Sequence, residues 1–543
     1  MTEQIQVPEP GATPALSPDP AEDAGRLDHA STGRLVTVLL ALVVLSEILP
    51  LQQSMVSVIL PKMAADFPAA GSGVTWSMTI LGVVGGATMA LVGKLGDVWG
   101  KKRVLFLCSA LFLISTVVCA LTTDWSVFLV ARGLGAVSWG MSAVEYGIVR
   151  DLMPRRWIPI SVGVLGTGFG LSSVIGPLAV GALEDHFGWR SIFWFLAGYT
   201  LVALPFTALA VPESTIRVRQ RFDLLGALLF GAGVGLVLIY ISQGSTWGWS
   251  EPTCLAYLIG GLVGLVAFVA WEARTKDPIM ELSLLRKPSV ATLMTIALLG
   301  TAVLSATSIA VIYMFETPPA AELKAQILQG IASSQNIPVE QLSQLVTFQG
   351  DVGYGAGFSV LQLAVHITMW TAVFGMVFGP LGGYVAKKKG ARLTMIISAV
   401  GFLAACLLWV PWHSTWQQQL TIGVLFGLGF GFFYAAGPNL LMDAVPAQRQ
   451  GVSAGMYAVF GGIGTSVATA VFTAIVSAHP LTFTMTGRDG APVVTEVPQV
   501  YADSGFRSVY LLVGVVPAAV MLLLALALRI GRTPARGGEA PAA

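Results

Sequence analysis

Long apolar runs alternate with short polar segments along the chain, and this pattern predicts a bundle of membrane-spanning helices. With a window of about 19 residues, the sequence contains fourteen apolar stretches long enough to cross a bilayer. A first group of six lies at 35–60, 74–93, 103–121, 126–148, 159–181 and 191–211. Two more lie at 224–242 and 253–271, and a second six at 290–315, 359–382, 392–411, 418–442, 452–477 and 507–529. We therefore expect an all-α polytopic membrane protein with fourteen transmembrane helices.

The composition agrees with this fold class. The 543 residues are 55% hydrophobic and only 11% charged, which leaves too little polar surface for a soluble protein. A net charge of +1 argues against a nucleic-acid partner. The four cysteines lie in or beside apolar runs without a C-x-x-C pair, so we expect small core residues, no disulfide framework, no metal site and no cofactor.

The distribution of Lys and Arg predicts the orientation. If the N-terminus lies inside, 24 of the 30 cations fall in cytoplasmic segments, and this asymmetry places both termini in the cytoplasm. Residues 1–33 are rich in Pro, Ala, Asp and Glu and lack an apolar run. They are predicted to be a disordered cytoplasmic tail and not a signal peptide, and 531–543 to be a second tail.

Two basic turns at equivalent places suggest an internal duplication. Gly93–Arg103 follows the second helix of the first group, and Gly383–Arg392 follows the second helix of the second group. The turns share two glycines and a basic cluster, with Lys387 standing where the first turn has Asp97. The interpretation is two pseudo-symmetric six-helix halves, 34–212 and 289–530, joined by a two-helix linker at 213–288. The alternative is two unrelated basic turns.

Two outer loops of the second half are unusually long and polar. The insert 316–350 carries Leu323, Ile327 and Ile331 at helical spacing, which predicts two short amphipathic helices. The loop 479–505 has a turn sequence between apolar flanks and is typical of a hairpin. They are interpreted as an outer cap or partner site, or alternatively as loops that only pack locally.

Several motifs together resemble the major facilitator superfamily, and in particular its fourteen-span drug:proton antiporter family. The first basic turn is similar to the signature loop after helix 2, with Gly93, Asp97, Gly100, Lys101, Lys102 and Arg103. Helix 4 carries Arg132, and helix 5 is similar to the antiporter motif at Gly170, Gly176, Pro177 and Gly181. Helix 6 opens with a G-W-R-x-x-F pattern and helix 7 with F-D-x-x-G, at Gly188, Trp189, Arg190, Phe193, Phe222, Asp223 and Gly226. The resemblance implies the major-facilitator fold, a central cavity and transport by alternating access.

The sequence departs from the family pattern in helix 1. Gln52 stands where the family usually has an aspartate, so a proton carrier has to be sought elsewhere. Glu47 lies thirteen residues into helix 1 from Arg34, roughly 20 Å at 1.5 Å per residue, which is near mid-membrane. A charge there costs about 2.5–3.5 kcal/mol, and a desolvated carboxyl group readily holds a proton. Glu47 is therefore the hypothesis for the proton-coupling residue; the alternative is a neutral carboxylic acid hydrogen-bonded to a neighbouring helix.

Arg132 is the second buried charge with a predicted role in coupling. It lies about 10 Å into helix 4, at a depth comparable to Gln52 and Gln53, and its guanidinium needs a carboxylate or several acceptors. It is interpreted as a switchable partner of a carboxylate or of an anionic substrate group. A purely structural tie between helices 1 and 4 is the alternative.

Two further groups complete the candidate sites. Glu145 is predicted to join an inner charge network, or conformational latch, with the residues of the first basic turn, namely Gly93, Asp97, Gly100, Lys101 and Arg103. Gln52, Gln53, Trp76, His366 and Tyr434 are candidates for the lining of a substrate cavity. For His366 and the aromatic residues, ordinary packing is the alternative.

The sequence shows no enzyme motif and no ATP-binding domain, so transport has to draw on an ion or solute gradient. We expect a secondary active transporter of the bacterial inner membrane, a proton-driven exporter of amphipathic compounds. Its partners would be protons, membrane lipids and a small-molecule or lipid-like substrate, and it would act as a monomer. The alternatives are a transporter of one endogenous lipid, metabolite or siderophore without proton coupling, and a membrane sensor that transports nothing.

Overall fold

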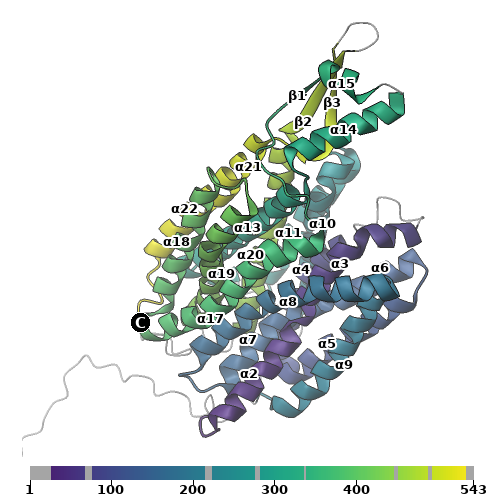
Figure 1. Ribbon diagram of the computed structural model, residues 1–543. Helices are drawn as coiled ribbons and strands as arrows, with labels where there is room; N and C mark the ends of the chain where they lie inside the picture. Colours follow the sequence, from purple (N-terminus) through teal and green to yellow (C-terminus); the bar gives the residue numbers. More distant parts are fainter. Residues whose placement is uncertain are drawn as a thin grey trace, which may run out of the picture.

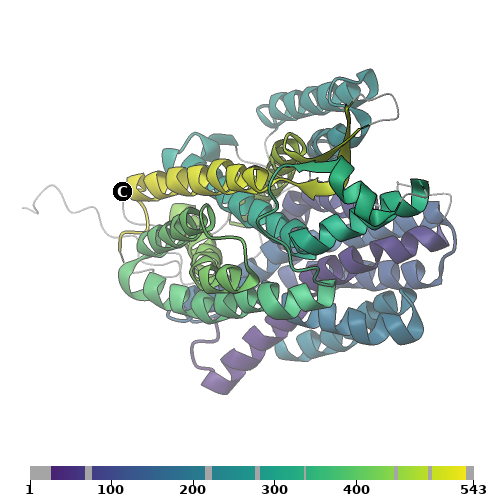
Figure 2. The ribbon, with the colours of Figure 1, turned by 45° about the horizontal axis from the view of Figure 1, so that its top comes forward.

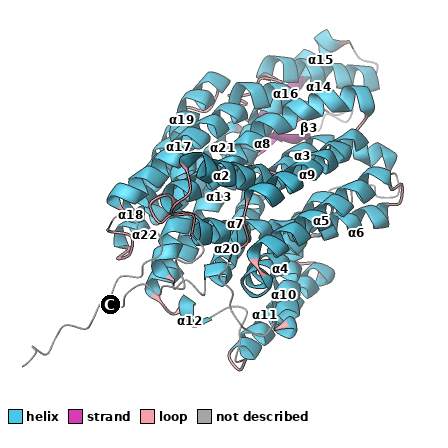
Figure 3. Ribbon diagram, turned by 90° about the horizontal axis from the view of Figure 1, so that it is seen from below, coloured by secondary structure: helices cyan, strands magenta, loops and turns pink. Residues whose placement is uncertain are grey.

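The computed structural model describes residues 26–67, 76–214, 223–275, 282–335, 338–445, 450–486 and 492–533. Most of both predicted tails, Phe222 and the tip of the predicted hairpin at 487–491 lie outside these ranges. The described chain forms long helices gathered in two groups, with one small sheet at one end (Figures 1 and 3). We call the end with the sheet the cap end, and the end with the turns at Lys101 and Lys387 the basic end.

The first half contains the six predicted helices, two of them interrupted. The first is divided into α2 (Thr32–Ser46) and α3 (Ile48–Asp66), and the fourth into α6 (Trp125–Ala136), the 3-10 turn η2 (Val137–Gly140) and α7 (Met141–Leu152). The others are α4 (Trp76–Trp99), α5 (Lys101–Leu121), α8 (Ile158–Phe187) and α9 (Arg190–Ala210). Pro50 explains the first interruption, because it cannot donate the amide hydrogen bond that would continue the helix past Glu47.

The linker and second half follow the prediction in the same way. The linker forms α10 (Leu224–Trp247) and α11 (Pro252–Glu272), followed by the short α12 (Leu282–Leu285). The second half contains α13 (Pro288–Glu316), α16 (Val360–Leu363), η3 (Ala364–Thr368), α17 (Met369–Lys389), α18 (Ala391–Trp409), α19 (Trp416–Ala444), α20 (Gln450–Ser477), α21 (Asp503–Val509), η5 (Tyr510–Val515) and α22 (Val516–Ala527). Within the described ranges, 11 helical stretches are long and apolar enough to cross a membrane. The helices α4, α8 and α10 lie at three further predicted spans, and the total of fourteen stays a prediction.

Each half packs around a core of its own. Phe112, Phe128 and Phe193 are completely buried in the first half, and Phe402 and Phe506 in the second. A third cluster joins the linker helices α10 and α11 to α13, α19 and α20. The linker therefore packs against both halves, because α10 lies against α4 of the first half as well as against α20 of the second.

The two halves meet along two pairs of helices, α8 with α17 and α4 with α20. Near the basic end, α8 and α17 approach so closely that a Cβ atom at Gly163 would lie 2.5 Å from the carbonyl oxygen of Gly379. A Cβ atom at Gly383 would likewise overlap the carbonyl oxygen of Pro159, which also accepts a hydrogen bond of 3.4 Å from Asn439 of α19. Small residues permit this contact between backbones, and the halves are closed against each other at this end.

The two basic turns share a backbone geometry as well as a sequence pattern. Gly100 has φ 110° and precedes α5, and Gly390 has φ 94° and precedes α18. Residues with a side chain rarely adopt this positive φ, so glycine is needed at both places. The match agrees with the interpretation of two related halves.

The two long loops of the second half combine into a single cap (Figure 2). The first contributes α14 (Ala320–Gln335), α15 (Val339–Leu345) and β1 (Val346–Gln349), and the second contributes β2 (Pro480–Thr486) and β3 (Pro492–Tyr501). The strands form an antiparallel sheet in the order β1-β2-β3, with Leu323, Leu342 and Phe483 buried in its core. The predicted helices and hairpin are present, but the sequence analysis did not foresee β1 or its pairing with β2.

Candidate functional site

Glu47 lies at the junction of α2 and α3 and is 1% exposed. Ser172 of α8 donates its hydroxyl hydrogen to Glu47 Oε2. The other carboxyl oxygen, Oε1, has no hydrogen-bond partner among the described residues. Tyr199 of α9 donates to the carbonyl of Val44, at 2.6 Å, and so holds the end of α2 in place. The carboxyl group is thus fixed at one oxygen and unpartnered at the other.

Glu145 of α7 lies near Glu47, close enough for the two carboxyl groups to interact electrostatically. It is 3% exposed, and its Oε1 also lacks a partner within the described ranges. This position differs from the predicted latch network. Gly147 and Asp151 face Lys101, whereas Glu145 lies about 200° around the helix from Gly147 at 100° per residue. Two buried carboxyl groups, one from helix 1 and one from helix 4, are therefore within electrostatic range of each other.

Arg132 is buried, but its described contacts are not with the carboxyl groups or glutamines of helix 1. Its Nε donates to the carbonyl of Ser77 on α4 at 3.2 Å, and its guanidinium lies 5.8 Å from the ring centre of Phe193 on α9. Gln52 is buried and its Nε2 has no partner in the described part of the chain, whereas Gln53 is exposed. Arg132 therefore ties α6 to α4 and α9, and its part in coupling stays a prediction.

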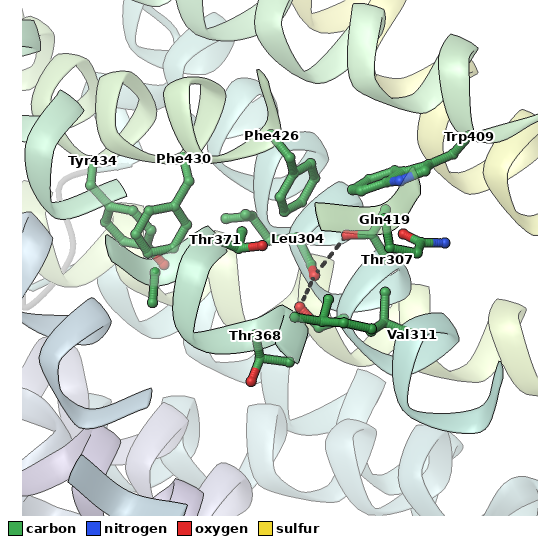
Figure 4. A pocket seen from close by; sticks show the side chains of 13 residues that line it. Leu304, Thr307, Val311, Thr368, Thr371, Trp409, Gln419, Phe426, Phe430 and Tyr434 are labelled. Atoms are coloured by element: carbon green, nitrogen blue, oxygen red, sulfur yellow. Dashed lines mark hydrogen bonds between the residues drawn. The ribbon is translucent and has the colours of Figure 1, made fainter. Parts of the chain in front are cut away.

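A cavity of about 200 Å³ lies inside the second half, between α13, α17, α18 and α19 (Figure 4). Trp409 and Gln419 stand at one end of it, and Phe430 and Tyr434 at the other. The complete lining is Leu304, Thr307, Ser308, Val311, Ile367, Thr368, Thr371, Ala372, Trp409, Gln419, Phe426, Phe430 and Tyr434. None of these lining side chains carries a charge. Of the predicted cavity residues, Tyr434 is in this lining.

Two other predicted cavity residues lie elsewhere. Trp76 packs against Trp247 of the linker, with ring centres 5.9 Å apart. His366 lies in η3 and stacks on Phe358 at 4.8 Å and against Trp416 at 5.1 Å, while its Nδ1 lies 2.7 Å from the carbonyl oxygen of Gln362. In this conformation both side chains take part in aromatic packing.

Three tyrosines interact with one another electrostatically, and they include a neighbour of Glu145 and a residue of the cavity lining. Tyr146, next to Glu145 on α7, is close enough to interact electrostatically with both Glu145 and Tyr434. Tyr457 of α20 lies near Tyr434 and Tyr146, and its hydroxyl has no partner among the described residues. The sequence analysis did not single out Tyr146. Its signal was a polar aromatic residue directly beside an acid in the second part of helix 4.

The first basic turn forms buried ion pairs at the basic end. Lys101 Nζ lies 3.0 Å from Asp97 Oδ1 and 3.1 Å from Asp151 Oδ2. Arg150 lies 3.9 Å from the other oxygen of Asp151, and Ser214 donates to Asp151 at 2.5 Å. Arg103 is exposed. The predicted latch is therefore centred on Lys101, and Asp151, which the sequence analysis did not select, is its second carboxylate.

The helix 5 and helix 7 motifs have local structural explanations. A Cβ atom at Gly176 would overlap the hydroxyl of Ser54, so glycine lets α8 pack against α3; Gly170, Pro177 and Gly181 lie within the same helix. Asp223 caps α10 by accepting the amide hydrogen of Gly226 at 2.9 Å, and it also accepts from Trp271 Nε1 at 2.8 Å. Gly176 and Asp223 therefore help to position helices.

The helix 6 motif forms a polar cluster at the cap end. Trp189 Nε1 donates to Asp66 Oδ2 at 2.9 Å, and Arg190 forms an ion pair with the same oxygen at 2.5 Å. These two donors hold the pKa of Asp66 below its ordinary value. Phe67 packs on the Trp189 ring at 5.8 Å. The cluster fastens α3 to α9.

A family model described as Major Facilitator Superfamily matches residues 42–339 and 343–543, and the chain belongs to this superfamily. It is therefore a multi-pass integral membrane protein of a transporter family.

Curated relatives include bacterial transporters. An uncharacterized MFS-type transporter of Mycobacterium tuberculosis is 27% identical over 428 residues, 78% of this chain, and the chain spans 57% of that protein's length. The multidrug resistance protein Stp of the same species is 25% identical, and the alignment covers 78% of this chain and 72% of the length of Stp. The probable actinorhodin transporter of Streptomyces coelicolor is 26% identical, and the alignment covers 78% of this chain and 69% of the length of that transporter.

Solved structures share the fold. The human organic anion transporter MFSD10 aligns with a TM-score of 0.55 at 16% identity, over 91% of this chain and 98% of that one. The proton:xylose symporter XylE, bound to 6-bromo-6-deoxy-D-glucose, aligns with a TM-score of 0.57 at 13% identity, over 93% of this chain and 98% of that one.

Proposed function

We propose that the protein is a proton-driven exporter of small amphipathic compounds in the bacterial inner membrane. The observation that carries the proposal is the pair of buried carboxyl groups, Glu47 and Glu145, at the centre of the first half. The names of two relatives, a multidrug resistance protein and a probable actinorhodin transporter, support export of organic compounds.

The carboxyl pair supplies a chemical basis for coupling. Two carboxylates near each other in a buried site resist ionising together, so the pair takes up and releases protons as a unit. Ser172 donates to Glu47, and this hydrogen bond favours whichever state of the transporter holds α2 and α8 together. A change of protonation thereby alters the relative stability of two arrangements of the helices.

The tyrosines could connect protonation of the carboxyl groups to the state of the cavity. Tyr146 is adjacent to Glu145 in the sequence and interacts with Tyr434 of the cavity wall. Because α7 and α19 belong to different halves, a shift of one half against the other changes this contact. Arg132 is proposed to support the position of helix 4 in this arrangement, and not to pair directly with Glu47.

The test is transport in proteoliposomes under an imposed pH gradient, with a panel of fluorescent dyes and endogenous lipids. We expect Glu47→Gln to abolish accumulation driven by the gradient while exchange of substrate across the membrane without a gradient continues. Glu145→Gln should lower the driven transport as well. The matched control is Glu322→Gln, because Glu322 is exposed on α14 of the cap. Driven transport that survives Glu47→Gln contradicts the coupling role.

A second candidate is export of one endogenous compound without proton coupling. It is favoured by Gln52, which occupies the place of the family aspartate, and by the cap, which covers part of the second half. The same experiment separates the two. Transport of a single compound that does not respond to the pH gradient supports the second candidate.

A further inference from the structure

We propose that the cavity of the second half binds an uncharged aromatic group that carries a hydrogen-bond donor and an acceptor side by side, such as an aryl carboxamide. Trp409 and Gln419 are the residues that recognise the polar part. The inference rests on the proposed transport function for its substrate, since it names the chemical class that would be carried. Binding itself requires no proton gradient.

The first support is a pair of buried polar atoms without partners. Trp409 is 3% and Gln419 1% exposed, and both line the cavity. Trp409 Nε1 and Gln419 Oε1 have no hydrogen-bond partner in the described part of the chain. Nearly all buried polar atoms in proteins are hydrogen-bonded, so this donor and this acceptor need partners that the described chain does not supply and that a bound ligand can provide.

The orientation of the Gln419 amide is fixed by its other contacts. Its Nε2 lies 3.4 Å from the carbonyl oxygen of His413 and 3.2 Å from the hydroxyl oxygen of Tyr510. A carbonyl oxygen only accepts, so the amide nitrogen has to face His413 and the amide oxygen has to face the other way. Trp409 can only donate. The lining therefore contains one unpartnered donor, from Trp409, and one unpartnered acceptor, from Gln419.

The remainder of the cavity selects for an uncharged and flat group. The far end is formed by aromatic side chains, with the rings of Phe430 and Tyr434 5.0 Å apart and Phe426 along the wall. Leu304 and Val311 add apolar surface, and none of the lining residues is charged. An ionic group would lose its hydration here without a counter-charge. A volume of about 200 Å³ suits one or two rings, since a cavity of roughly 150 Å³ holds benzene.

Two π-helical segments bear on the cavity and provide independent support. Ile367 and Thr368 of the lining belong to η3, and Tyr510, which accepts from Gln419, begins η5. Such segments are rare and are frequently found at functional sites. One π-helical segment thus forms part of the cavity wall, and the other supplies the hydroxyl that holds the Gln419 amide.

The experiment uses three probes of the same shape, namely 2-naphthamide, 2-acetonaphthone and 2-naphthoate, with the purified full chain in detergent and titration calorimetry. The carboxamide offers an acceptor and a donor, the ketone only an acceptor, and the carboxylate a charge. We expect the wild-type protein to bind the carboxamide about 3–10-fold more tightly than the ketone, the worth of one hydrogen bond, and the carboxylate most weakly.

Variants assign each polar atom. Trp409→Phe removes the donor and should weaken carboxamide and ketone alike by about 3–10-fold. Gln419→Leu removes the acceptor and should weaken only the carboxamide. The controls are Trp412→Phe and Gln417→Leu, since both residues are exposed beside the site and line no part of it; neither should change any affinity. Gln419 has internal contacts, so its variant is checked by thermal unfolding, whereas the Trp409 N–H makes no described hydrogen bond to lose.

The outcomes separate this inference from the coupling proposal. Equal affinity for the three probes, no effect of Trp409→Phe, or an equal loss in a control variant would overturn the site. If Glu47→Gln leaves driven transport intact while the probes are still discriminated, coupling through Glu47 fails and the site stands. If the protein does not discriminate among the probes while Glu47→Gln still abolishes driven transport, the proposed binding site fails and the coupling role of Glu47 stands.

Discussion

The ammonium of Lys101 lies 3.1 Å from Asp151 and joins the start of α5 to the end of α7. Asp97, at the end of α4, lies 3.0 Å from the same ammonium. All three side chains are largely buried, so the ammonium relies on these two carboxylates for its counter-charge. The first basic turn is therefore a tie between three helices, more than a marker of orientation.

Neutralising this tie should slow the conformational cycle. Each of Asp97→Asn and Asp151→Asn leaves Lys101 with one carboxylate, so we expect slower transport with substrate binding still measurable. The double variant leaves a buried ammonium unpaired, which typically costs about 3–5 kcal/mol, and should accumulate poorly. Arg103→Gln is the matched control, because Arg103 is exposed in the same turn. Unchanged turnover in all variants would reduce the turn to a topology signal.

Tyr146→Phe tests the contact between the carboxyl pair and the cavity. The variant keeps the ring and removes the hydroxyl, so probe binding should be retained while proton-driven transport falls by roughly tenfold, equivalent to about 1.4 kcal/mol. The measurement is the rate of driven uptake beside a binding isotherm. Tyr240→Phe serves as the control, since Tyr240 lies on α10 against Trp249. Equal rates in both variants would exclude a role for the Tyr146 hydroxyl.

Added bulk between α8 and α17 should open the basic end. A Cβ atom at Gly163 or Gly383 would meet backbone atoms of the opposite half, which cannot move aside like a flexible side chain. We expect Gly163→Ala and Gly383→Ala to speed the chemical labelling of an Asn439→Cys variant, which probes the same contact. Gly198→Ala is the control, since among the described residues no atom outside its own stretch of helix lies within 4 Å of its Cβ position. If labelling stays slow in both interface variants, the contact between α8 and α17 accommodates the added methyl group without opening.

The Asp66 cluster predicts a loss of stability in acid. The pKa of Asp66 is lowered by Trp189 and Arg190, so its stabilising contribution is complete above the ordinary value near 3.9 and declines as pH falls through the lower folded value. Asp66→Asn should reduce stability at neutral pH by less than about 1 kcal/mol, because the pair is partly exposed. It should also flatten the acid limb of a thermal-unfolding profile below about pH 4. If the loss of stability in acid is the same in the variant, other titratable groups cause it.

Cross-linking tests the pairing of the two loops. Thr347 and Thr484 are direct partners across β1 and β2, so cysteines at these positions should form a disulfide on mild oxidation. Since both strands belong to the same half, transport should persist in the oxidised state and be the same after reduction. Failure to cross-link would contradict the register, and arrest by the disulfide would mean that the strands separate during the cycle.

The helices were predictable because the amino-acid composition of a short segment is enough to identify a membrane span. A run of about 20 apolar residues has few other structures available to it, and the glycines at positions 100 and 390 marked turns that need positive φ. Their boundaries were less predictable, since Pro50 interrupts a run that hydropathy alone treats as continuous.

The site was only partly predictable because it depends on how helices rotate and meet. Glu47 was selected from its depth, but its neighbour Glu145 was assigned to the basic turn, since sequence distance does not tell which face of α7 a residue occupies. The cavity lining consists of Thr, Phe and Leu, which are common in any membrane helix. The sheet of the cap pairs residues of β1 and β2 that are more than 130 positions apart. A local sequence pattern does not identify so distant a pairing partner.

The strand pairing between the two loops has a mechanical consequence. Backbone hydrogen bonds in the cap fasten the connection after α13 to the connection after α20, and Asp503 N adds a bond of 2.9 Å to the carbonyl oxygen of Asp351. The rim of the second half is thereby braced at the cap end, whereas the corresponding tie of the first half described above, Asp66 with Arg190, is a partly exposed side-chain pair. At the cap end the second half is therefore tied through backbone hydrogen bonds, and the first half, which contains Glu47 and Glu145, through a side-chain pair.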